Sequence, residues 1–260
     1  MQAFVNKTVL EQTSFDSAAP GGLAALVHRF SDPGQYVLTF LRDEHVIARY
    51  PLAVLAEPPK EEALPQQVSF DLEKLRRPLP ERPAPLLAPP PAAGPPTLFV
   101  LGVGGYARFT SSRREVGYAI AAEGAAGHAK AERFDSRRLG AADLFAVTLL
   151  RPGAYSLTNT LTGAKGRITV AYPALGKEPY RPPAPLSVQC AEHGFAPATS
   201  DLQPAQGIIF RFAVPSRIKI DLVTPNDGPG KAVQRQARPV VQPEQARRPF
   251  ARWTKPPGKA

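Results

Sequence analysis

A short pattern occurs twice in the sequence, and it constrains the fold more than any other feature. Each copy has Phe-Asp-Ser followed at the same spacing by Pro-Gly and Tyr, one starting at Phe15 and the other 119 residues later at Phe134. An apolar run, residues 23–30 or 144–150, leads into each Pro-Gly pair, as in strands that enter tight turns. Because solenoid repeats are about 20–50 residues long, the wider separation predicts a duplication into two similar β domains in tandem.

The second copy continues with an ordered set of phrases. After Phe134-Asp135-Ser136 come Gly140-Ala141-Ala142-Asp143-Leu144-Phe145, then Pro152-Gly153-Ala154-Tyr155, and finally Gly166-Arg167-Ile168-Thr169-Val170. This order resembles the closing half of a cupredoxin domain, well over about 40 residues and loosely over the rest of residues 97–173. The resemblance implies a Greek-key β-sandwich, and a weaker likeness extends it to the first copy.

The same resemblance implies where a copper ion would be bound. Cupredoxins hold copper with a Cys thiolate, two imidazoles and a weak axial ligand, usually Met. The corresponding positions here hold Asn159, Thr162 and Lys165 in the second copy and Phe40 in the first. The only Cys, Cys190, and the only Met, Met1, lie outside both loops. We therefore expect no type 1 copper centre and no cofactor, with the sandwich used as a metal-free scaffold.

Proline is the outlier in the composition. The chain has 31 prolines in 260 residues, against a usual proline content of about 5%, and so many helix breaks favour an all-β fold. A single Cys excludes internal disulfides. Residues 1–7 lack the features of a signal peptide, and no apolar run is long enough for a transmembrane segment. These features predict a cytoplasmic protein, or a periplasmic or extracellular one if an N-terminal segment is missing.

Composition shifts divide the chain into five expected segments. They are a β domain with the first copy (1–56), a Pro-rich linker (57–96), a cupredoxin-like sandwich with the second copy (97–176), an additional β segment (177–224) and a basic Pro-rich tail (225–260). In the linker, Val68, Phe70 and Leu72 alternate with polar residues, which predicts a strand that docks on a domain. The additional segment has too few strands to stand alone, so it should complete a sheet of this chain or of a neighbouring subunit.

The net charge of +10 is concentrated in two segments. Residues 97–176 carry +5 and the tail carries +6, whereas the first domain is nearly neutral. The arginines of the second domain could form a basic face: Arg108, Arg113, Arg114, Arg133, Arg137, Arg138 and Arg151. Such a face would be solvated, or would contact an acidic protein surface or a nucleic-acid backbone.

The tail contains a group of residues typical of interface anchors. Two aromatic side chains stand among three arginines, and Trp253 is the only Trp of the chain. Because interface anchors are enriched in Trp and Arg, we expect this group to bind a partner: Arg247, Arg248, Phe250, Arg252 and Trp253.

Three further motifs have simpler structural explanations. Cys190 and His193 have the spacing of two metal ligands, but a four-coordinate site needs two more, and a buried thiol beside a surface imidazole is favoured. The glycines of residues 102–105 precede a β-rich segment, which favours a tight turn over a phosphate-binding loop. The Asp and Ser of each Phe-Asp-Ser motif are expected to cap turns, because no His recurs near them as a catalytic base.

Together these features predict a non-enzymatic structural or interaction subunit of a larger assembly, possibly one that contains further copies of itself. The alternative is a cytoplasmic protein that binds nucleic-acid phosphates non-specifically through its basic face and tail. A third possibility is an exported domain with a metal site of another kind.

Overall fold

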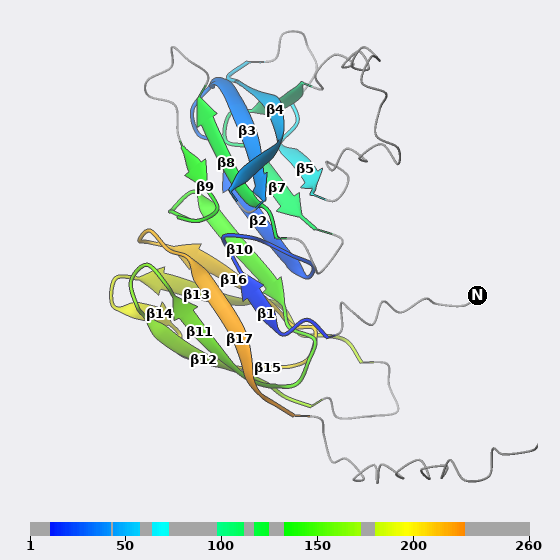
Figure 1. Ribbon diagram of the computed structural model, residues 1–260, viewed down its shortest axis with the longest axis vertical. Helices are drawn as coiled ribbons and strands as arrows, with labels where there is room; N and C mark the ends of the chain where they lie inside the picture. Colours follow the sequence, from blue (N-terminus) through cyan, green and yellow to red (C-terminus); the bar gives the residue numbers. More distant parts are fainter. Residues whose placement is uncertain are drawn as a thin grey trace, which may run out of the picture. The chain divides into compact units, whose positions relative to one another are not determined.

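The computed structural model describes residues 11–42, 44–57, 64–72, 98–111, 117–124, 133–172 and 180–226 (Figure 1). Within these ranges the chain forms seventeen β-strands and no helix, which confirms the all-β prediction. Arg113 and Arg114 of the expected basic face lie outside the described residues, and so does the tail group 247–253.

The longest sheet, sheet B, has seven strands. Its order is β14 (Gly194–Ala196), β13 (Leu186–Ala191), β16 (Gly207–Phe212), β10 (Asp143–Thr148), β2 (Ala24–Arg29), β7 (Tyr106–Thr110) and β5 (Gln67–Asp71). Strands β2 and β10 belong to different copies of the sequence pattern, and they pair antiparallel at the middle of the sheet. Sheet B therefore joins the two copies into one continuous layer.

Two five-stranded sheets complete the fold. Sheet A has the order β1 (Ser14–Asp16), β17 (Ile218–Pro225), β11 (Gly153–Asn159), β12 (Lys165–Val170) and β15 (Thr199–Leu202). Sheet C has the order β6 (Phe99–Gly102), β4 (His45–Leu55), β3 (Gly34–Arg42), β8 (Ala119–Gly124) and β9 (Phe134–Asp135).

One face of sheet B forms half of the core. Paired residues of six neighbouring strands form a row that is at most 1% exposed: Phe70, Phe109, Leu26, Phe145, Phe210 and Val188. Sheet C packs on this face, because the Phe109 ring lies 6.1 Å from Phe40 of β3 and 5.7 Å from Phe134 of β9. The apolar residues of sheet A, such as Phe15 and Ile220, belong to the same buried cluster. The three sheets thus form a β-sandwich.

Strands β1–β8 follow the first copy of the pattern and β9–β17 follow the second, and we call these sets the first and second halves. Corresponding strands of the two halves pair in the same way. Strands β7 and β16 pair with β2 and β10, and β8 and β17 pair with β3 and β11. The first strands are exchanged, because β1 pairs with β17 and β9 pairs with β8. Each Phe-Asp-Ser motif is therefore hydrogen-bonded to the last strand of the other half.

These pairings differ from the expected division of the chain. Strands β6, β7 and β8 pair with β4, β2 and β3, although residues 97–124 were expected in the second domain. A single segment of residues 1–56 has too few strands to cover its own apolar face, and these later strands supply the cover. The additional segment likewise pairs within this chain, because β16 and β17 join β10 and β11.

The docked strand expected within the linker is confirmed. β5 pairs parallel with β7 at the edge of sheet B. Phe70 and Leu72 are 1% and 2% exposed, and Val68 packs against the core.

Candidate interaction surface

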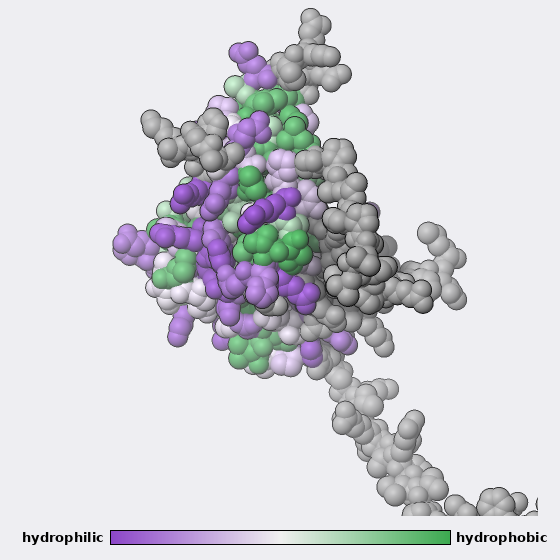
Figure 2. All heavy atoms as spheres, turned by 45° about the horizontal axis from the view of Figure 1, so that its top comes forward, coloured by the Kyte–Doolittle hydropathy of each residue, from purple (hydrophilic) through white to green (hydrophobic). Residues whose placement is uncertain are grey.

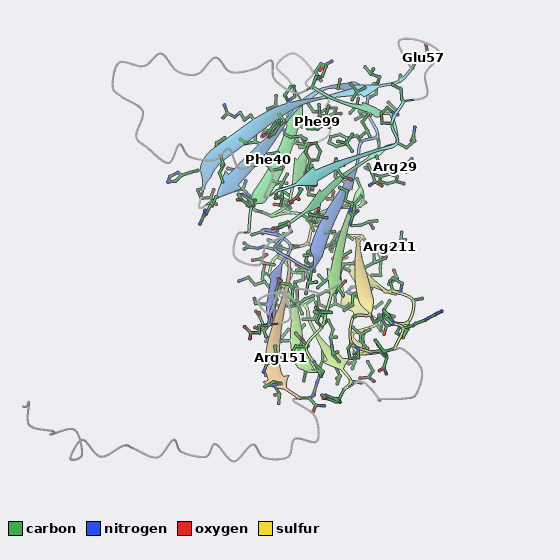
Figure 3. The ribbon with its side chains drawn as sticks, turned by 90° about the vertical axis from the view of Figure 1, so that its right-hand side faces the viewer. Arg29, Phe40, Glu57, Phe99, Arg151 and Arg211 are labelled. Carbon is green, nitrogen blue, oxygen red and sulfur yellow. The ribbon has the colours of Figure 1, made fainter. Side chains whose placement is uncertain are left out.

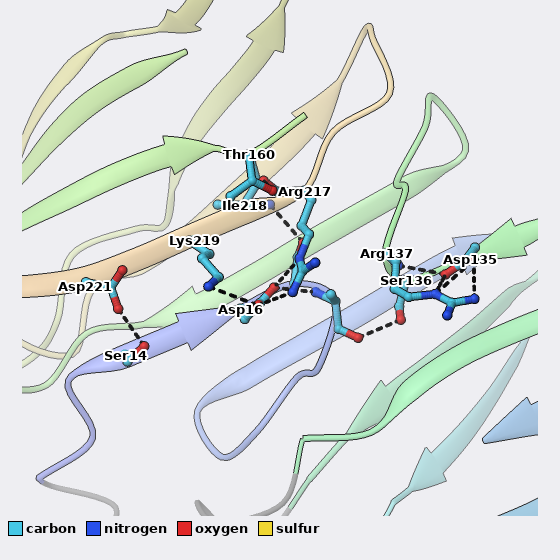
Figure 4. Close-up of polar contacts among 12 residues, drawn as sticks. Ser14, Asp16, Asp135, Ser136, Arg137, Thr160, Arg217, Ile218, Lys219 and Asp221 are labelled. Carbon is cyan, nitrogen blue, oxygen red and sulfur yellow. Dashed lines mark hydrogen bonds and ion pairs between the residues drawn. The ribbon is translucent and has the colours of Figure 1, made fainter. Parts of the chain in front are cut away.

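The Phe-Asp-Ser motifs cap turns and join strands (Figure 4). Oδ1 of Asp16 accepts a hydrogen bond from the Ala18 N–H at 2.9 Å, and Oδ1 of Asp135 accepts the equivalent bond from the Arg137 N–H at 2.9 Å. The motif serines are fully buried, at 0% exposed. Ser136 accepts a hydrogen bond from the Ile120 N–H and donates one to the Ala18 carbonyl, each at 2.9 Å. The capping prediction is confirmed for the Asp side chains, whereas the Ser hydroxyls join distant segments instead of capping turns.

The loop that would hold copper ligands in a cupredoxin is stabilised by an amide side chain. Asn159 is 1% exposed, and its Nδ2 donates to the Ser216 hydroxyl at 2.9 Å. Its Oδ1 accepts from the N–H groups of Leu161 and Arg217, each at 3.1 Å. The Thr162 hydroxyl accepts from the Ala164 N–H. These side chains close the loop after β11 and tie it to the start of β17.

The other candidate motifs have structural roles as well. Cys190 is buried, and burial raises the pKa of its thiol to about 12, whereas His193 is exposed. Within the described ranges, no group of three His, Cys, Asp or Glu side chains could hold a metal ion. Gly104 has a φ of 80° in the turn between β6 and β7, and a strand follows it. The tight-turn interpretation of the glycines is therefore confirmed.

The arginines of the expected basic face lie on different parts of the sandwich. Arg108 is on β7 of sheet B, Arg133 precedes β9, Arg137 and Arg138 follow it, and Arg151 precedes β11. Arg137 pairs with Asp135 at 2.9 Å and with Glu44 at 3.2 Å. Its hydrogen bond to Asp135 raises the pKa of its guanidinium. Part of the expected positive surface is therefore already neutralised within the chain.

A different surface is prominent on the opposite side of sheet B from its buried row, and we call it the outer face. The half-buried residues at its centre are apolar: Ala25, Val27, Leu144, Ala146 and Ile209. They are contiguous, because Ala146 lies opposite both Ala25 and Ile209, and Val27 lies opposite Leu144. A solvated sheet face normally alternates to polar residues. The apolar centre of this face is therefore a candidate contact surface.

Arginines border this apolar centre. Arg108 lies opposite Val27 and Arg211 lies opposite Leu144, so these two exposed arginines flank the apolar pair in one row across the sheet. Arg29 is also exposed, and its Nε donates to the Gly104 carbonyl at 3.3 Å. Arg29 and Arg211 lie along the right-hand side of the ribbon in Figure 3. Within the described part of the chain, none of the three arginines has an acidic partner.

A shallow groove of about 420 Å³ runs across the outer face. Small residues, among them Ala25, Ala146 and Gly207, form its floor, and Arg108 and Thr110 lie along it. The groove therefore combines a floor of small residues with a cationic edge at Arg108.

The outward side of sheet A provides a contrast. Its outward residues are mainly polar or charged: Ser156, Thr158, Arg167, Thr169, Lys219 and Asp221. Figure 2 shows a face of the molecule on which hydrophobic residues occur as separate patches among hydrophilic ones. The apolar centre of sheet B is therefore not a general property of the sheets in this fold.

The sequence prediction missed the outer face, although a signal was present. The runs 23–30 and 144–150 are apolar at nearly every position, which is typical of a strand covered on both faces.

No protein-family model, curated protein or solved structure matches the chain. Among the described residues, no helix is long and apolar enough to cross a membrane.

Proposed function

We propose that this chain is a non-enzymatic structural or interaction subunit of a larger assembly. In this proposal its scaffold is a duplicated, metal-free sandwich of the cupredoxin-like, Greek-key kind. The linker and the tail group around Phe250 and Trp253 add further contacts with partners. The outer face of sheet B is the observation that carries the proposal.

The occupant of this face is an extended protein segment whose side chains on one side are aliphatic at the centre and acidic at both ends, since every second residue of an extended chain faces the same way. Its aliphatic groups cover Val27, Leu144 and the alanine groove, because burial of apolar area drives association. Its carboxylates meet Arg108 and Arg211, since arginine binds carboxylates through two parallel hydrogen bonds. The exposed Arg29, Arg108 and Arg211 make this face positively charged, which disfavours basic partners.

Nucleic acid is the second candidate. It is favoured by the same arginines and by Tyr106, whose ring is 41% exposed beside Arg29, because bases stack on aromatic side chains. The aliphatic centre argues against it, since it offers neither stacking nor charge to a phosphate backbone.

Fluorescence anisotropy with defined probes distinguishes these candidates. The probes are a labelled peptide with two glutamates flanking two valines at every second position, the same peptide with lysine in place of glutamate, and a labelled single-stranded oligonucleotide. We expect the full chain to bind the glutamate peptide, and Ala146→Arg to weaken binding about tenfold, or ~1.4 kcal/mol. Arg167→Glu on the outward side of sheet A is the matched control and should leave the affinity unchanged.

The other outcomes count against the proposal. Equal binding of the two peptides, or no binding of either, would contradict an acidic, aliphatic partner at this face. Tight binding of the oligonucleotide that collapses with salt would put the nucleic-acid function first, because released counterions produce that salt dependence.

A further inference from the structure

The pairing of β2 with β10 is symmetric in its backbone. The spacing of the sequence pattern makes Phe145 the counterpart of Leu26, and these two residues lie opposite each other, both 0% exposed. A two-fold axis between them exchanges the strands. The same axis relates the His28–Asp143 pair at one end of the paired strands to the pair formed by their two counterparts at the other end.

The side chains break this symmetry. The counterpart of His28 is Val147, and the counterpart of Asp143 is Ala24. At one end of the paired strands His28 therefore lies opposite Asp143, and at the other end Ala24 lies opposite Val147. A polar pair and an apolar pair occupy two positions that the backbone makes equivalent.

The polar pair is buried and closely held. His28 and Asp143 are 2% and 5% exposed, and Nδ1 of His28 lies 2.6 Å from Oδ1 of Asp143. The other carboxylate oxygen accepts the Gly140 N–H at 2.6 Å. The imidazole packs against the rings of Phe30 and Phe134, at 4.5 Å and 4.7 Å between centroids. In such surroundings each of the two groups needs the other, since a buried polar group without a partner is costly.

The exchanged strands distinguish the two halves only in part. β1 and β9 carry the same Phe-Asp-Ser motif and share a serine contact, but Asp16 pairs with Arg217 at 2.8 Å, whereas Asp135 pairs with Arg137 of its own turn. The Ser17 hydroxyl accepts the Ile218 N–H at 2.9 Å, and the Ser136 hydroxyl accepts the Ile120 N–H at 2.9 Å. The Asp16–Arg217 pair is partly exposed, and such ion pairs contribute little, so most of the selectivity between like and unlike halves must come from another part of the fold.

We propose that the His28–Asp143 pair supplies this selectivity and blocks open-ended self-assembly of the chain. If β2 paired in the same register with β2 of a second molecule, His28 would lie opposite Ala24. If β10 paired with β10, Asp143 would lie opposite Val147. Either pairing buries a polar group without its partner, whereas pairing of β2 with β10 joins Nδ1 of His28 to the Asp143 carboxylate.

The form of the assembly follows from this selectivity. A molecule paired through β2 alone still has β10 free for another molecule, so like pairing builds a growing chain. If β2 pairs with β10 of a second molecule, the polar pair is kept. When β10 of the first molecule also pairs with β2 of the second, no strand is left free and the complex is a closed dimer. The polar pair therefore acts against species larger than a dimer. This inference does not depend on the partner proposed above.

The test is refolding of the full chain from urea over a range of protein concentrations, followed by size-exclusion chromatography with light scattering. His28→Val combined with Asp143→Ala makes the inward residues at these positions identical in both strands. We expect this double variant to form species larger than a dimer, in a fraction that rises with concentration and exceeds that of the natural chain several-fold. Replacement of both partners of a buried hydrogen-bonded pair by apolar groups can be nearly neutral for stability, so the variant is expected to fold.

Two further variants complete the experiment. Exchange of the pair, His28→Asp with Asp143→His, should restore the size distribution of the natural chain. The matched control, Ala24→Val with Val147→Ala, alters the apolar end of the same strands and should not create larger species. Monomers or closed dimers alone from the first double variant would overturn the proposal. So would large species from the exchanged pair in the same amount.

Discussion

The two Pro-Gly-x-Tyr turns contain glycines at equivalent positions that should respond oppositely to the same substitution. Gly153 begins β11 with a φ of 146°, a conformation that L side chains rarely adopt. A Cβ added there would lie 2.4 Å from the Thr224 carbonyl oxygen and 2.8 Å from Cδ1 of Leu222. At Gly34 the nearest atom to an added Cβ is Cε2 of Tyr36, at 3.6 Å, an ordinary contact.

These geometries give the expected magnitudes. Backbone strain of this kind costs about 1–3 kcal/mol, and overpacking costs about 1–3 kcal/mol. Gly153→Ala should therefore lower the free energy of unfolding by about 3 kcal/mol, since part of the overlap can relax. Gly34→Ala should raise the free energy of unfolding by about 0.5 kcal/mol, because alanine reduces the entropy of the unfolded chain.

Urea unfolding and differential scanning calorimetry measure both variants against the natural chain. At about 2–4 °C per kcal/mol for a protein of this size, Gly153→Ala should lower the Tm by about 6–12 °C. Gly34→Ala should raise it slightly. If the two variants had equal effects, the asymmetry between the turns, and the close approach of β17 to Gly153, would be wrong.

Three further predictions concern buried groups. The Tyr155 hydroxyl donates a hydrogen bond to the Arg151 carbonyl at 2.7 Å. Tyr155→Phe should therefore lower the free energy of unfolding, measured by urea titration, by about 1 kcal/mol. An unchanged midpoint would show that this bond contributes nothing to stability. Burial raises the pKa of the Tyr155 phenol and of the Cys190 thiol to about 12, from ordinary values of 10.0 and 9.0. The unfolded chain then loses these protons at lower pH than the folded chain, so the free energy of unfolding should fall as the pH rises above about 9. For the same reason Cys190 should react with a thiol reagent at pH 8 only on unfolding, and rapid reaction of the folded chain would contradict its burial.

Much of the local structure was predictable from the sequence. Alternation of apolar residues identifies strands such as Ile218–Pro225, and the glycines of residues 102–105 mark the turn between β6 and β7. The docked strand around Phe70 was predictable for the same reason, since period two is a property of the strand itself. Asn159 stands where the resemblance to cupredoxins would place a copper ligand, and it closes its loop by hydrogen bonds.

The candidate site was less predictable. The expected basic face relied on charge alone, and charge does not say which arginines share a surface. Arg108 is on sheet B, whereas Arg137 is paired with Asp135 beside sheet C. Arg29 and Arg211 belong to the outer face because β7, β2, β10 and β16 are neighbours in one sheet, which the sequence did not show.

The sequence by itself determined that this chain is all-β, where most turns fall and which side of each strand is apolar, because those properties depend on residues close together in the chain. The tertiary structure alone decided which strands are partners. The motif at Phe15 and the motif at Phe134 are identical, so no local signal tells β1 to pair with β17 and β9 with β8. That choice involves contacts between residues far apart in the chain, such as Asp16 with Arg217, and His28 with Asp143, which are 115 residues apart in the chain and 2.6 Å apart in the fold.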